Sequence, residues 1–159
     1  MTAKLHGWRI SKYDPADRGK NEWTAYSDIG RVFGGRTLMM EEYRRVENAY
    51  IRTILAAADA AGQKNLRVES LEVEAHDVTA ITNGMLLRRD GGELEDVIRR
   101  NLREELWCRL EGEQFTVTFG YDYYVHLYTL LPRETVAACA EAEGLYAEPL
   151  PPVYAEEKI

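Results

Sequence analysis

The sequence predicts an α+β fold, in which a mostly antiparallel sheet of four to five strands is packed by about three helices. Apolar residues recur at helical spacing in three segments and alternate with polar residues in the others, giving the order β, α, β, α, β, β, α, β. Such an order can form one sheet covered on one side. The length of 159 residues fits one domain, and we expect residues 1–148 to form it, with 149–159 as a Pro-rich, mobile tail.

The first predicted strand spans residues 5–10, with Trp8 and Ile10 available to the core. Residues 11–30 are polar and rich in turn signals such as Asp14-Pro15, and so long a loop in a small domain is often functional. Trp23 and Tyr26 are spaced like neighbours on a helix, which predicts a short helical turn inside this loop.

The most regular helical pattern covers residues 38–61, with Thr37 as a candidate N-cap and Gly62 as the stop. Residues 66–73 alternate as a strand whose phase changes near its middle, which predicts a bulge. The segment 76–92 has no clear pattern, and we assign it no element.

A second amphipathic helix is predicted over residues 93–106. Pro132 is well placed to begin a third helix, which Gly144 ends, and residues 145–148 can form a short edge strand.

Between these helices lies the densest signal in the chain, the aromatic segment 107–128, WCRLEGEQFTVTFGYDYYVHLY. Its first part alternates as a strand with one buried face, and the whole predicts a β-hairpin. Beyond Gly120 both faces carry aromatic or ionisable groups, with Asp122 and His126 on one face. A sheet with tyrosines on both faces is either covered twice or presented to a partner.

The net charge, the apolar segments and the cysteines of the chain limit the functions that it can have. The formal charge of −7 argues against nucleic-acid binding through a broad basic surface and suits a basic protein partner. The sequence shows no membrane span and no secretory signal at its start, so we expect a cytoplasmic protein. Cys108 and Cys139 lack the spacing of a metal site, and we expect no cofactor.

The candidate interface consists of the polar and aromatic residues that the core pattern does not require: Trp23, Tyr26, Asp28, Asp122, Tyr124 and His126. Tyr and Trp give large contact area at low entropic cost, which favours protein recognition. Two alternatives remain open. One is an enzyme with an Asp/His/Tyr site near the hairpin, although Asp122 and His126 would lie roughly 13 Å apart on an extended strand. The other is a single-stranded nucleic-acid binder that stacks bases on tyrosines.

The strings WRISKYDP, EWTAYSDIG, LREELWCRLEG and FGYDYY together resemble an uncharacterised family of small bacterial proteins. The resemblance covers about four-fifths of the chain by position and implies no reaction or ligand. Small acidic bacterial proteins of this kind are similar in character to toxin immunity proteins, by analogy only. We therefore expect a non-enzymatic protein-binding module, an immunity or inhibitor protein for a basic toxin such as a nuclease; the oligomeric state stays open.

Overall fold

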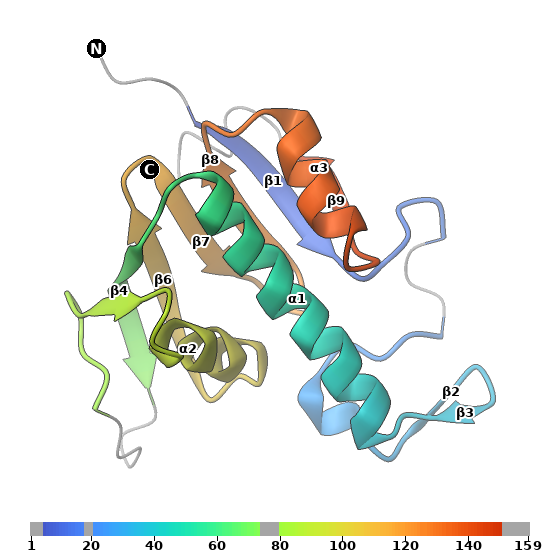
Figure 1. Cartoon of the computed structure of the whole chain (residues 1–159). Coiled ribbons are helices and arrows are strands. Elements are labelled where there is room, and N and C mark those ends of the chain that lie inside the picture. Colours follow the sequence, from blue (N-terminus) through green and yellow to red (C-terminus); the bar gives the residue numbers. More distant parts are fainter. Residues whose placement is uncertain (1–4, 18–20, 74–79, 151–159) are drawn as a thin grey trace.

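The computed structural model describes residues 5–17, 21–73 and 80–150 and contains one antiparallel sheet of seven strands (Figure 1). The strands follow one another across this sheet in the order β5-β4-β6-β7-β8-β1-β9. Their bounds are β1 (His6–Ser11), β4 (Asn65–Val73), β5 (Leu86–Arg88), β6 (Leu106–Gly112), β7 (Phe115–Phe119), β8 (Val125–Thr129) and β9 (Tyr146–Pro149). Two further strands, β2 (Val32–Phe33) and β3 (Arg36–Thr37), pair only with each other in a separate hairpin.

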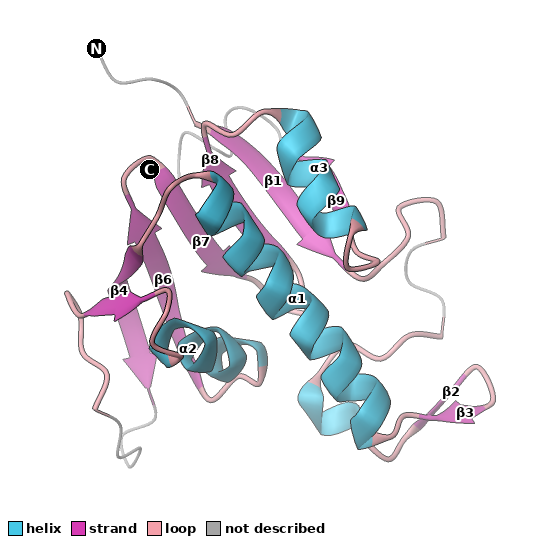
Figure 2. Cartoon of the chain, in the orientation of Figure 1, coloured by secondary structure: helices cyan, strands magenta, loops and turns pink. Residues whose placement is uncertain are grey.

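Three helices cover one face of the sheet: α1 (Met40–Ala60), α2 (Glu93–Leu102) and α3 (Arg133–Glu141) (Figure 2). In Figure 1, α1 runs across the sheet, α2 lies over the β4–β6 side and α3 over the β1–β9 side. The predicted α+β class is confirmed.

Helix α1 keeps the predicted pattern, because its buried side chains recur at spacings of three and four from Tyr43 to Ala58. Gly62 ends the helix in the left-handed conformation, with φ of 72°. The predicted N-cap is wrong: Thr37 belongs to β3, and Met39 occupies the cap position without a side-chain hydrogen bond.

The sheet has seven strands, and the predicted four to five is wrong. One additional strand, β5, comes from the unassigned segment and pairs with β4 through Leu87 opposite Leu66. The other comes from the aromatic segment, which forms the three strands β6, β7 and β8 instead of one two-stranded hairpin. Helix α2 ends at Leu102 rather than residue 106, since Leu106 already belongs to β6.

The bulge predicted in the second strand is present. The register of β4 against β6 shifts between Glu69 and Glu72, and Ser70 adopts a positive φ of 53°. Strand β9 includes Pro149, the first residue of the expected tail, and Leu150 N–H donates to the carbonyl of Gly7 at 2.8 Å. Residues 151–159 lie outside the described residues.

Candidate binding site

An aromatic cluster holds the beginning of α1 against the turn that precedes β8. Tyr43 and Tyr50 of α1 meet the ring of Tyr123, with centroids 6.1 and 5.6 Å away. Trp23 packs against both Tyr43 and Tyr123 at 5.3 Å, and Tyr26 reaches Tyr43 at 5.0 Å. All five contacts are tilted or edge-to-face, and edge-to-face is one of the arrangements that aromatic rings favour.

The turn between β7 and β8 explains why the alternating pattern stops after Gly120. Asp122 and Tyr123 are consecutive residues with positive φ, 59° and 65°, an uncommon conformation for side chains other than glycine. Tyr50 Oη donates to the carbonyl of Tyr123 and Tyr13 Oη to the carbonyl of Asp122, each at 2.7 Å. These bonds and the burial of Tyr123 offset the cost of this backbone, which is about 1–3 kcal/mol for each such residue.

A buried carboxylate forms the polar centre of the cluster. Glu47 is 1% exposed and accepts hydrogen bonds from Tyr43 Oη at 2.7 Å, from Arg103 at 2.7 and 3.0 Å and from Arg99 at 3.2 Å. Tyr43 Oη also hydrogen-bonds Tyr123 Oη. Because the carboxylate has both tyrosine and arginine donors, its charge is satisfied inside the fold.

Burial also shifts the acidity of the tyrosines. It raises the pKa of Tyr13, Tyr43, Tyr50 and Tyr123 above the usual value near 10, because a phenolate would lose its solvation there. The four hydroxyl groups therefore stay protonated near neutral pH, where they serve as hydrogen-bond donors.

Three of the predicted interface residues lie together on the loop before β2. Trp23 is only 8% exposed, and Tyr26 is half-buried with the Arg103 guanidinium 4.8 Å from its ring centroid. Asp28 is buried and caps the short 3-10 turn Tyr26–Asp28, accepting from the backbone N–H groups of Thr24 and Ala25 at 2.9 and 3.2 Å. The predicted helical turn in this loop is present.

The other three predicted residues lie at the start of β8. Asp122 is exposed in the turn and precedes the strand, so the expectation that it shares a strand face with His126 is wrong. Tyr124 is half-buried, with Tyr13 at 5.3 Å between centroids and the Arg9 guanidinium 4.8 Å from its ring. His126 is paired in register with Arg9 and Thr118, and its side chain alternates with the core residues Val125 and Leu127. The Tyr13 hydroxyl connects these three residues with the three on the loop before β2. It donates to the carbonyl of Asp122 at 2.7 Å and lies 3.3 Å from the carbonyl of Trp23.

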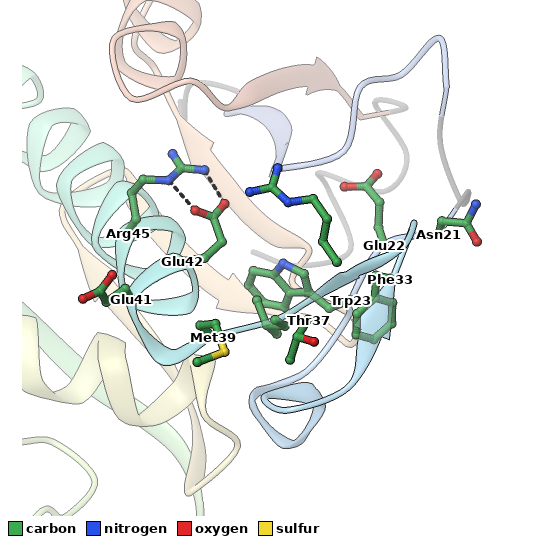
Figure 3. A pocket seen from close by; sticks show the side chains of 11 residues that line it. Asn21, Glu22, Trp23, Phe33, Thr37, Met39, Glu41, Glu42 and Arg45 are labelled. Carbon is green, nitrogen blue, oxygen red and sulfur yellow. Dashed lines mark hydrogen bonds and ion pairs between the residues drawn. The ribbon is translucent and has the colours of Figure 1, made fainter.

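A groove that the sequence did not predict opens beside Trp23. It has a volume of about 740 Å³ and runs between the β2–β3 hairpin and the first turns of α1 (Figure 3). Its apolar lining is Trp23, Phe33, Leu38 and Met39, and its polar lining is Asn21, Glu22, Arg36, Thr37, Glu41, Glu42 and Arg45.

The groove lies next to exposed apolar side chains. Met39 is 61% exposed in the groove wall, and Val32 is 64% exposed on the neighbouring hairpin. Glu42 and Arg45 pair through two hydrogen bonds of 2.6 and 2.9 Å, as Figure 3 shows, whereas Glu41 forms no ion pair with another described residue. One feature of the sequence could have predicted this hairpin. Gly34 and Gly35 connect the paired residues Phe33 and Arg36, and both glycines have positive φ, as a tight two-residue hairpin turn requires.

No family model matches the chain, and neither the curated proteins nor the solved structures searched include a significant match. Among residues 5–17, 21–73 and 80–150, the helices lack the combination of length and apolarity that a membrane span requires.

Proposed function

We propose that this chain is a protein-binding module whose partner docks at the groove between the β2–β3 hairpin and α1. The observation that carries the proposal is the hairpin itself, which projects from the body in Figure 1. It exposes Val32, and Met39 is exposed in the wall of the groove. A two-stranded hairpin is marginally stable alone, and ordering each residue costs about 1–2 kcal/mol. A partner that covers Val32 and Met39 would offset this cost by burying them.

The chemistry of the groove suggests what the partner presents. An apolar side chain would fill the space over Phe33 and Met39, and a neighbouring cation would meet the Glu41 carboxylate. The net charge of −7 would speed the approach of a basic protein. On this basis the finer proposal is an immunity or inhibitor protein that neutralises a basic toxin by direct binding.

Met39 offers a clean test because it occupies the N-cap position of α1 with no capping hydrogen bond. Asp is among the best N-cap residues, so Met39→Asp should keep or raise stability while it replaces an exposed apolar side chain of the groove wall by a charged one. Leu130→Asp is the matched control, since Leu130 is also an exposed apolar residue, 39% accessible, and does not line the groove.

The experiment compares the three proteins as baits in lysate of the source organism, followed by binding of the purified candidate partner. The proposal expects wild type and Leu130→Asp to retain the same basic protein. Met39→Asp should bind this protein at least tenfold more weakly, which corresponds to a loss of about 1.4 kcal/mol in binding free energy. Inhibition of the partner's own activity by stoichiometric complex formation would support the inhibitor assignment. Equal binding by all three folded baits would exclude the groove as the interface.

A further inference from the structure

Among the strands of the described residues, β5 lies at one end of the sheet, so that one of its backbone edges is open. Just beyond its paired residues, the N–H of Arg89 donates to the carbonyl of Lys64 at 2.9 Å. Residues of an antiparallel strand alternate between bonding the neighbouring strand and pointing away from it. Leu86 and Arg88 therefore direct their backbone N–H and C=O groups to the open side, where a further strand would pair.

The two edges of the sheet differ in how they are protected against a further strand. Natural edge strands are often protected by proline, which has no N–H to offer, or by charged side chains. At the opposite edge, β9 contains Pro149. In β5, by contrast, Leu86 is 56% exposed, and Met85 before it is 37% exposed. An open edge with exposed apolar side chains is the kind of surface to which an extended peptide adds a strand.

A groove of about 900 Å³ lies beside β5, and we call it the edge groove. Leu86 and Arg88 both line it, as expected for residues two apart on one face of a strand. The rest of its lining comes from the end of α1, the segment that leads into β4 and the residues after β5: Asp59, Gly62, Gln63, Lys64, Asn65, Arg89 and Asp90. A strand added to β5 would thus place alternate side chains in this groove.

The cations of the edge groove indicate the charge of the partner. Lys64 is exposed and forms no ion pair with another described residue. Arg88 lies 3.4 Å from Asp90, but these side chains are 72% and 75% exposed, and such exposed pairs contribute little. Arg89 is held by two hydrogen bonds to Asp59 and is neutralised there. Lys64 and Arg88 therefore remain for a carboxylate of the partner, in a chain whose net charge is −7.

We propose that β5 is a docking edge for an extended acidic segment of a protein partner, which adds a strand to the sheet. The backbone of this segment bonds Leu86 and Arg88, an apolar side chain covers Leu86, and a carboxylate pairs with Arg88 and Lys64. Since side chains on one face of a strand are two residues apart, the segment carries Asp or Glu two positions from an apolar residue. The edge groove shares no lining residue with the groove beside Met39, so this inference does not rest on the proposed function.

The test selects peptides from a phage-displayed random library on the folded full-length chain and measures their binding, with a fluorescein label, by fluorescence anisotropy. The selected peptides should share an acidic residue two positions from an apolar one. Leu86→Pro removes an outward N–H at an edge position that tolerates proline, and should weaken binding about tenfold. Ala147→Pro is the matched control, because Ala147 directs its N–H outward at the opposite edge, and it should bind like wild type.

Two further measurements separate the edge from other surfaces. Arg88→Glu should weaken binding of the same peptide, and replacement of the peptide's acidic residue by Lys should restore it. In the wild-type complex, NMR should show that the amide protons of Leu86 and Arg88 become protected from hydrogen exchange, a readout that does not depend on whether Leu86→Pro folds. Met39→Asp should bind the peptide as tightly as wild type, which keeps this result distinct from the test of the proposed function.

Three outcomes would overturn the proposal. One is a selection that enriches no peptide above a surface without the protein. Another is a set of enriched peptides that lack the spacing of an acidic and an apolar residue. The third is a complex in which the amide protons of Leu86 and Arg88 exchange as fast as in the free chain, which would place the peptide elsewhere on the molecule.

Discussion

Replacement of the buried carboxylate, Glu47→Ala, should destabilise the fold by about 3 kcal/mol. Breaking a buried ion pair by removing one partner costs about 3–5 kcal/mol, because the remaining charge stays buried and unpaired. Here the remaining guanidinium groups of Arg99 and Arg103 keep 29% and 20% of their side-chain exposure, and water can partly solvate them. This places the expected loss at the lower end of the range.

The matched control is Glu42→Ala on the same helix. Glu42 also pairs with an arginine, but the two side chains are 50% and 64% exposed. Exposed ion pairs contribute about 0–1 kcal/mol, so we expect Glu42→Ala to cost less than about 1 kcal/mol.

Urea unfolding followed by far-UV circular dichroism and by tryptophan fluorescence would measure both variants. With a denaturant slope of about 1–3 kcal/mol per molar urea, a loss of about 3 kcal/mol moves the midpoint by about 1–3 M. Glu47→Gln would separate charge from shape, since it keeps a side-chain oxygen as acceptor but removes the negative charge that Arg99 and Arg103 share. A loss for Glu47→Ala no larger than that for Glu42→Ala would show that the carboxylate is not the polar centre of the cluster.

Three further changes test other parts of the structure. The buried tyrosines should leave stability unaffected by pH until about pH 10. Above that pH stability should fall by up to about 1.4 kcal/mol per pH unit for each buried tyrosine, because the unfolded tyrosines ionise there while the folded ones stay protonated. Tyr50→Phe should reduce this slope by one tyrosine, and an unchanged slope in alkaline urea titrations would contradict the assignment. Gly112→Ala should lower the free energy of unfolding by about 1–3 kcal/mol, since the new Cβ would lie 2.2 Å from Gln63 Oε1. Thermal unfolding should show that the double variant Gly112→Ala/Gln63→Ala regains part of this loss. Equal stability of the single variant and wild type would refute the close approach. Asp122→Lys tests whether the interface predicted from the sequence extends beyond the groove, since Asp122 is exposed in a turn and does not line the groove. It should leave the melting temperature within a few degrees of wild type and weaken binding of a basic partner several-fold by calorimetry. A folded variant with unchanged affinity would remove Asp122 from the interface.

The elements predicted well from the sequence are those whose side chains repeat one environment over many residues. Helix α1 has a buried stripe along its whole length, and β4 shows its bulge as a change of phase in the alternation. Strand β5 has only three residues, of which Leu87 alone is buried, so it carries no period that a sequence pattern could reveal. The β2–β3 hairpin is equally short, and only the glycine pair marks it.

The candidate site was harder to predict because its contacts join segments far apart in the chain. Trp23 and Tyr26 stood out by composition, but their packing on Tyr43 depends on how the loop crosses the end of α1. Tyr123 looked like one of several strand tyrosines until the positive φ of the turn directed it into the core. The groove residue Met39 carried no signal, since an exposed methionine next to a helix resembles any other flanking residue.

The position of β1 between β8 and β9 has a consequence for how the chain folds during synthesis. The partner of His6 in the sheet is Thr129, so β1 has no neighbouring strand until most of the chain has been made. At about 5–20 residues per second, this interval is on the order of ten seconds. During this interval Trp8 and Ile10, which are buried in the complete fold, have no sheet to pack against. Strand β7, once paired with β6, also has an open edge until β8 is made. Pairings between such distant segments close slowly, so the last steps of folding should be the arrival of β8 and the insertion of β1, the period in which the nascent chain is most prone to aggregate.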